Sequence, residues 1–373
     1  MTVVVDESST GSGRDRLESV LKRAADVGAS DLLLVADCPP CALSRGSWCD
    51  LDAQRLAPGD VEALVLSFLT DAQRQALDKS GDVDLGLDVE AVGRIRVNVH
   101  RQRRTLAAAI RFIADHPPEF DDLNLPAAIA RFADLPRGLV LVTGGTGSGK
   151  STTSAALIER INRTRRAHVI TLEDPIEYRF TNDQCIIEQR EIGIDAPSFA
   201  GALRHVVRQK PDVILVGEMR DRETIATTLT AAELGHLVIA TMHTVSAAQT
   251  IERIVDVFDG AQQAYVRIQL AVTLQAVVCQ TLLRADTPCG LVPATEVMVR
   301  TPAVARAIRD NELHLLGGMI ETGRNRGMHL LDHKLAELVA RGVLAVDEAM
   351  ARVVDAEAFR RQLDRSAGES PKR

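Results

Sequence analysis

The chain has 373 residues, of which 46% are hydrophobic, 25% charged and 3% aromatic. At roughly 100–200 residues per domain this length favours two domains, and the composition is that of an ordinary globular protein, which excludes wholesale disorder. The net charge of −7 argues against a protein that binds nucleic acid through bulk positive charge.

Targeting signals are missing from the sequence. No window reaches the ~18 uninterrupted apolar residues of a membrane-spanning helix, and Asp6 and Glu7 stand where a signal peptide would carry positive charge. We therefore expect a soluble, cytoplasmic chain with no transmembrane segment. Cys38 and Cys41 form a CxxC pair, but no second pair follows, so we expect free thiols and no metal bound to them.

The first part of the chain mixes helix and strand patterns. Apolar residues at helical spacing predict helices over 14–30 and after Pro58-Gly59-Asp60, and alternation predicts strands over 83–89 and 94–100. We expect residues 1–115 to form an α+β domain without a nucleotide loop. The Pro- and Asp-rich segment 116–126 is predicted to be a linker to a second domain, residues 127–373.

After the linker, apolar strands alternate with helices, which is typical of a parallel sheet in an α/β domain. The expected strands are 138–143, 168–172, 213–217 and 237–241, and the expected helices are 150–163, 198–209 and 221–234. From residue 287 onward the pattern is mostly helical.

The sharpest motif is a phosphate-binding loop, G-x-x-x-x-G-K-[ST], placed after an apolar strand and before a helix. Its glycines allow successive backbone N–H groups to surround an anion, the helix N-terminus adds partial positive charge, and the lysine adds a full charge. A plain glycine-rich turn would explain the glycines but not the Lys-Ser pair. The residues expected to bind ATP are Gly144, Gly145, Thr146, Gly147, Ser148, Gly149, Lys150, Ser151 and Thr152.

Hydrolysis also requires carboxylates, which in such sheets lie at the carboxyl ends of neighbouring strands. Glu218 follows an apolar strand directly and is the candidate that orients water. Gly217 stands where many such ATPases carry a metal-binding Asp, so we expect metal ligands from Glu173, Asp174 or Glu177. Each of these three could equally be a helix cap or a solvated charge.

Two histidines, His236 and His243, bracket the last predicted strand of this group. A lone histidine on a strand is usually structural, but His243 at the carboxyl end could sense the γ-phosphate. No third ligand accompanies them, so a zinc site is not expected.

The stretch from Val207 to Asp221 resembles the signature of the type II/IV secretion ATPase family. Glu173-Asp-Pro-Ile-Glu177 resembles the family's aspartate box, and the two histidines resemble its histidine box. The resemblance covers almost the whole chain and is greatest to the pilus-retraction ATPases of the family.

This resemblance implies a PAS-like domain at the N-terminus, a RecA-like P-loop ATPase domain with a mostly helical C-terminal extension, and a hexameric ring. It assigns ATP and Mg²⁺ as cofactors, with Ser151 and Glu177 at the metal and Glu218 as the catalytic glutamate. By the same resemblance His236 and His243 act in catalysis, and arginines of the first domain reach the phosphates as arginine fingers. The matching arginines are Arg94, Arg96, Arg104 and Arg111, of which Arg104 and Arg111 are our candidates.

The function implied is a motor ATPase that retracts a type IV pilus in twitching motility. It would act from the cytoplasmic side of the inner membrane through a platform protein, since the chain has no anchor of its own. An accessory pilus ATPase or a type II/IV secretion ATPase of similar architecture is the alternative within the family. Two other classes stay open, a P-loop kinase of small molecules and a nucleotide-gated regulatory module with negligible turnover.

Overall fold

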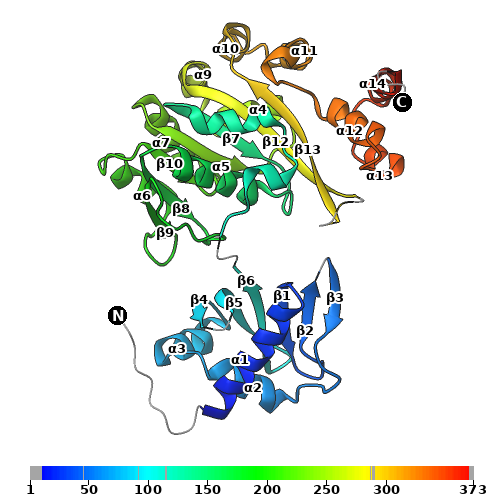
Figure 1. Ribbon diagram of the computed structural model, residues 1–373. Coiled ribbons are helices and arrows are strands. Elements are labelled where there is room, and N and C mark those ends of the chain that lie inside the picture. The colour runs from blue at the N-terminus through cyan, green and yellow to red at the C-terminus, as the bar shows by residue number, and fades with distance from the viewer. Residues whose placement is uncertain are drawn as a thin grey trace. The chain divides into compact units, whose positions relative to one another are not determined.

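The computed structural model describes residues 11–44, 46–90, 92–113, 116–285, 287 and 290–368. The chain divides into two compact units, Met1–Asp115 and His116–Arg373. Each unit has its own sheet (Figure 1). No helix in the described ranges combines the length and the apolar character needed to cross a membrane.

The first unit is built on a six-stranded sheet with the order β3-β2-β1-β6-β5-β4, in which every neighbouring pair is antiparallel. Helix α1 buries Leu17, Val20, Leu21 and Ala24, which lie on one helical face at i, i+3, i+4 and i+7. The elements are α1 (Gly11–Asp26), β1 (Ala29–Val35), β2 (Cys41–Ser44), β3 (Ser47–Asp50), α2 (Pro58–Leu66), α3 (Asp71–Ser80), β4 (Asp82–Val89), β5 (Gly93–Gln102) and β6 (Thr105–Phe112).

The second unit contains a seven-stranded sheet with the order β13-β12-β7-β11-β10-β8-β9. All neighbouring pairs are parallel except β12–β13. The first half of the unit comprises η1 (Phe120–Leu123), α4 (Ala127–Ala130), η2 (Arg131–Asp134), β7 (Gly138–Thr143), α5 (Lys150–Thr164), β8 (His168–Glu173), β9 (Ile186–Glu191), α6 (Phe199–Val206), β10 (Val213–Val216), α7 (Arg222–Glu233) and β11 (Leu237–Met242). Every residue of β7, β10 and β11 is buried, which explains their uninterrupted apolar sequences.

The C-terminal half of this unit adds an antiparallel hairpin and a group of helices. Its elements are α8 (Ala247–Asp256), α9 (Gly260–Thr273), β12 (Leu274–Arg284), β13 (Leu291–Val299), α10 (Pro302–Arg309), η3 (Leu313–Leu315), α11 (Leu316–Thr322), η4 (Arg324–Arg326), α12 (Leu331–Ala340), α13 (Val346–Met350) and α14 (Ala356–Gly368). The last three helices gather beside the β12–β13 hairpin (Figure 1). The region is therefore less purely helical than the sequence pattern indicates, because Leu291–Val299 pairs with β12 along its whole length.

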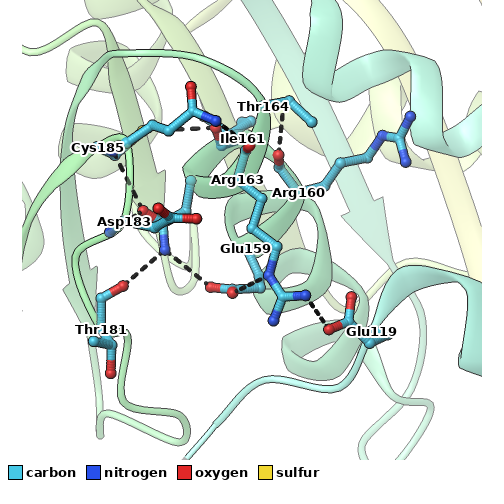
Figure 2. A network of polar contacts seen from close by, with 11 residues as sticks. Glu119, Glu159, Arg160, Ile161, Arg163, Thr164, Thr181, Asp183 and Cys185 are labelled. Carbon is cyan, nitrogen blue, oxygen red and sulfur yellow. Dashed lines mark hydrogen bonds and ion pairs between the residues drawn. The ribbon is translucent and has the colours of Figure 1, made fainter.

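The segment predicted to be a linker, 116–126, packs onto the second unit. Phe120 is only 6% exposed and lies in the same apolar cluster as residues of α5. Figure 2 shows that Glu119 forms an ion pair with Arg163 near the end of α5, and Arg163 also pairs with Glu159 at 2.6 Å. The Asn162 side chain binds the 181–185 loop through the Thr181 carbonyl and the Asp183 and Cys185 amides. These contacts anchor the far end of the helix that begins at the glycine-rich loop.

Candidate nucleotide site

The glycine-rich loop connects the buried strand β7 to helix α5, and its glycines serve different needs. Gly144, Gly147 and Gly149 have φ angles of 147°, 74° and 84°, which L-residues rarely adopt. A Cβ on Gly144 would lie 2.1 Å from the Gln280 carbonyl oxygen, so strand β12 leaves no room for a side chain. A Cβ on Gly145, by contrast, would have no neighbour within 4 Å, so this part of the loop borders open space where an anion can approach.

Lys150, the first residue of α5, closes the loop on itself. Its Nζ donates to the carbonyl oxygens of Gly144 and Gly145, both at 2.9 Å. Burial lowers the pKa of Lys150, and the negative charges of Glu218 and Glu177 act in the opposite direction. The lysine, the loop and both carboxylates therefore share one electrostatic environment.

Gln280 on β12 supports the loop from the neighbouring strand. Its Nε2 donates to the Ser148 carbonyl oxygen at 2.8 Å, and its Oε1 accepts from Thr153 Oγ1 at 2.8 Å. The residue is 6% exposed, and both partners belong to the loop or to the first turn of α5. Our sequence reasoning missed Gln280, although a polar residue within the apolar stretch 270–283 was the available signal.

Glu218 lies just beyond β10, at the same edge of the sheet as the loop. Its Oε1 is 2.6 Å from Arg220 Nε and 2.9 Å from His243 Nε2, and its side chain is 16% exposed. Burial raises the pKa of Glu218, but contacts with Arg220 and His243 outweigh burial and hold that pKa below its ordinary value. Glu218 is therefore an ionised carboxylate near neutral pH.

The aspartate-box segment follows β8 and contains carboxylates in different environments. Glu173 is buried, accepts from Thr171 Oγ1 at 2.6 Å and from Gln189 Nε2 at 3.2 Å, and burial raises its pKa to about 7. Asp174 is exposed and Glu177 is half-buried. A Cβ on Gly217 would lie 3.0 Å from the Leu172 carbonyl oxygen and 3.2 Å from Glu173 Cα, so β8 leaves little room for a side chain at this position.

Tyr178 and Gln189 fasten this segment to its surroundings. The Tyr178 hydroxyl is 2.9 Å from Thr152 Oγ1 on α5, so a residue close to the loop lysine contacts the aspartate-box segment. Gln189 on β9 donates to the Tyr178 carbonyl oxygen at 2.8 Å and accepts from the Phe180 amide at 2.9 Å. Sequence reasoning identified neither Tyr178 nor Gln189.

The structure separates the two predicted histidines. His243 follows the carboxyl end of β11 and contacts Glu218. His236 precedes the amino end of the same strand, where its Nδ1 is 2.7 Å from the Pro211 carbonyl oxygen. Seven residues of extended chain span roughly 23 Å at ~3.3 Å per residue, so His236 does not reach the site of this chain.

The predicted arginines all lie in the first unit. Arg111 Nε pairs with Asp31 at 2.9 Å, Arg94 pairs with Asp88 at 3.2 Å, and Arg96 lies 3.7 Å from an oxygen of Asp84. Arg104 is exposed at the two-residue turn between β5 and β6, with a φ of 65°.

Metal ligands in this site are few. Within the described ranges, no group of three or more His, Cys, Asp or Glu side chains is arranged to hold a metal ion. Ser151 on α5 and Glu177 supply oxygen atoms, the donors that Mg²⁺ prefers, and a magnesium ion there would take its remaining ligands from phosphate and water. The described cysteines, including Cys38 and Cys41, are free thiols, and Cys289 lies outside the described residues.

A cavity of about 860 Å³ opens beside the loop. Its walls are the loop residues 145–148, the β12 residues 279–282, and the segments 330–333 and 351–355 of the C-terminal helical region. The cavity is large enough for a drug-sized ligand.

Comparison with known proteins places this geometry in a family. A model described as type II/IV secretion system protein matches residues 120–356. The type IV pilus retractation ATPase PilT of Pseudomonas aeruginosa is 42% identical over 89% of this chain and 96% of its own length. The twitching motility protein of Neisseria gonorrhoeae is 40% identical over 87% of this chain, namely 325 residues, and 87% of its own length.

A solved structure resembles the whole fold. The crystal structure of the pilus retraction motor PilT with bound ADP matches with a TM-score of 0.86 and 42% identity, covering 92% of this chain and 98% of that one. A family model over most of the chain and relatives at this identity lead to one conclusion. The chain belongs to the type II/IV secretion system protein family.

Proposed function

We propose that this chain is a P-loop ATPase that drives retraction of a type IV pilus. The observation that carries the proposal is the position of an ionised Glu218, in contact with His243, at the sheet edge where the loop closes around Lys150. The relatives named for pilus retraction and twitching motility match this chain over most of their own length.

In this proposal each residue has a separate role in hydrolysis. The loop amides and the N-terminus of α5 bind the phosphates of ATP, and Lys150 moves its ammonium group from the loop carbonyls to the phosphate oxygens. Glu218 orients water toward the γ-phosphate and accepts its proton. Ser151 and Glu177 hold the magnesium ion, which supplies positive charge to the phosphates when it is bound.

Membership of the family supports a proposal for the wider architecture. In the proposal the first unit is a PAS-like domain and the second a RecA-like ATPase domain, and six chains form a ring. Arg104 and Arg111 are the candidate arginine fingers that reach a phosphate, and His236 is part of the histidine box. The ring acts on an inner-membrane platform protein from the cytoplasmic side, and nucleotide exchange moves one unit against the other as rigid bodies.

The proposal is tested by turnover and by assembly together. Phosphate release should be measured for the wild type, for Glu218→Gln and for Glu252→Gln, which replaces an exposed carboxylate on α8. We expect Glu218→Gln to lose at least about 100-fold in kcat, as for a lost general base, and Glu252→Gln to match the wild type. Native mass spectrometry with and without ATP should detect a hexamer, and an active monomer would contradict the motor.

The competing classes give different products and phenotypes. A small-molecule kinase would transfer phosphate to an acceptor, so the absence of free phosphate would favour it. A regulatory module would bind ATP without hydrolysing it, both in the wild type and in Glu218→Gln. Deletion in the source organism should abolish twitching while leaving surface pili, whereas loss of effector export would favour a secretion ATPase.

A further inference from the structure

We infer that Arg220 is a positioning residue for Glu218, which holds one carboxylate oxygen so that the other is presented to the attacking water. This inference rests on the proposed function, because it assigns Arg220 a part in the step that Glu218 performs. Arg220 was not among the residues predicted from sequence.

The backbone around Arg220 is fixed on both sides. Met219 is 3% exposed, and its amide donates to the Thr241 carbonyl oxygen on β11 at 3.0 Å. Asp221 caps α7, with its carboxylate accepting from the Thr224 amide at 2.9 Å and the Thr224 hydroxyl at 2.7 Å. Because Met219 and Asp221 are both held by hydrogen bonds, the backbone of Arg220 is fixed. Its side chain contacts Glu218 from this position.

The contact geometry distinguishes the two oxygens of Glu218. Arg220 Nε and His243 Nε2 both lie closest to Oε1, at 2.6 and 2.9 Å. Two donors on one oxygen fix the rotation of the carboxylate and leave Oε2 as the oxygen better placed to accept a proton from water. His243 alone would hold Oε1 from the β11 side only.

The burial of the two partners indicates what the contact does. Arg220 is 68% exposed, so its side chain contributes little packing, whereas Glu218 is 16% exposed. Exposed ion pairs contribute little to stability. The contact of Arg220 with Glu218 therefore adds little stability. Its main effect is to orient the largely buried carboxylate of Glu218.

Several charges face this pair from the surrounding elements. Lys150 on α5 and His243 after β11 face Glu218, and Asp174 in the segment after β8 faces Arg220. Glu177, from the same segment, acts on Lys150. Removing Arg220 leaves Glu218 with His243 and Lys150 as its cationic neighbours, so the pKa of Glu218 should rise toward the value that burial favours.

The test compares Arg220→Ala and Arg220→Lys with Arg222→Ala. Arg222 is an exposed arginine two residues away that pairs with Asp259 at 2.9 Å, so its loss controls for a charge removed from the same segment. Steady-state kinetics of ATP hydrolysis should be measured over pH 5.5–9 for each protein, with thermal unfolding as a check of folding.

We expect Arg220→Ala to lower kcat about tenfold, the loss of one charge-assisted hydrogen bond in the transition state, with KM for ATP within about twofold. The acid limb of its kcat profile should move to higher pH. Arg220→Lys should restore the acid limb, because the charge returns, but not the full kcat, because a lysine lacks the planar geometry of the guanidinium group. Arg222→Ala should match the wild type.

Four outcomes would overturn the inference. An Arg220→Ala protein with wild-type kcat and pH profile refutes the role of Arg220. If Glu218→Gln is inactive in the same assay, the proposed function stands. A fall in kcat with an unmoved acid limb, or an equal fall in Arg222→Ala, assigns the effect to general structure. If the wild type itself does not hydrolyse ATP, the proposed function fails and this inference fails with it.

Discussion

Replacing Glu173 by Gln should stabilise the second unit above neutral pH. Burial raises the pKa of Glu173 from 4.5 to about 7 in the folded chain. Below pH 4.5 the carboxyl is protonated in the folded and unfolded states alike and its titration has no effect. Between pH 4.5 and 7 the unfolded chain loses the proton first, so the free energy of unfolding falls as pH rises. Above pH 7 the carboxyl is ionised in both states, and the free energy of unfolding no longer changes through this group.

The size of the effect follows from the two pKa values. A difference of about 2.5 pKa units corresponds to about 3 kcal/mol at 1.36 kcal/mol per unit. A glutamine keeps the acceptor oxygen for Thr171 and Gln189 but carries no charge, so it avoids this loss. We expect Glu173→Gln to exceed the wild type by about 3 kcal/mol at pH 8, and the difference to shrink toward pH 5.

Urea unfolding followed by far-ultraviolet circular dichroism at pH 5, 6, 7 and 8 measures this difference. The single tryptophan, Trp48, lies in the first unit and is an internal fluorescence control. Its transition should be the same in both proteins, and Glu252→Gln should stay within about 0.5 kcal/mol of the wild type. A difference between Glu173→Gln and the wild type that does not change with pH would refute the reasoning.

Three further substitutions test the supports of the site. Gln280→Met leaves two buried polar groups, one in the loop and one in α5, without partners, which costs about 1–3 kcal/mol. Calorimetry should therefore detect an ATP affinity at least about fivefold weaker. An unchanged affinity would contradict the role of Gln280 as a support of the loop. Tyr178→Phe removes the hydrogen bond to Thr152 and should cost about 1 kcal/mol of unfolding free energy, and a neutral result would mean that water replaces the contact. Gly217→Ala places a methyl group against backbone atoms of β8 and should cost about 1–3 kcal/mol in urea unfolding, whereas Gly260→Ala, with nothing within 4 Å, should not destabilise; equal effects would exclude steric crowding as the cause.

The central strands could be predicted from sequence because they are buried on both faces. Strands β7, β8, β10 and β11 begin and end within one residue of the expected positions, since continuous apolar runs mark them. Strand β9 lies at the sheet edge and mixes polar with apolar residues, so no run marks it. Strand β12 follows α9 directly, and an apolar stretch that continues from helix into strand hides the boundary.

The local parts of the site could be predicted, and its long-range contacts could not. The glycine-rich loop is a contiguous motif, and Glu218 follows an apolar strand, so both can be identified locally. The family prediction is confirmed by the matching model and relatives. The contact of Glu218 with His243 depends on the order β7-β11-β10, and the support by Gln280 depends on β12 lying beside β7. Neither adjacency follows from chain order.

The hydrogen bonds of Gln280 have a mechanical consequence. A loop that is tied to a neighbouring strand cannot change shape alone, and β12 pairs from Ala276 to Arg284 with β13, against which α12 packs. Tightening of the loop around a phosphate would pull on β12 and tilt the hairpin beneath the C-terminal helices. The Gln280 side chain thus couples the glycine-rich loop to the β12–β13 hairpin and to the helix packed against it.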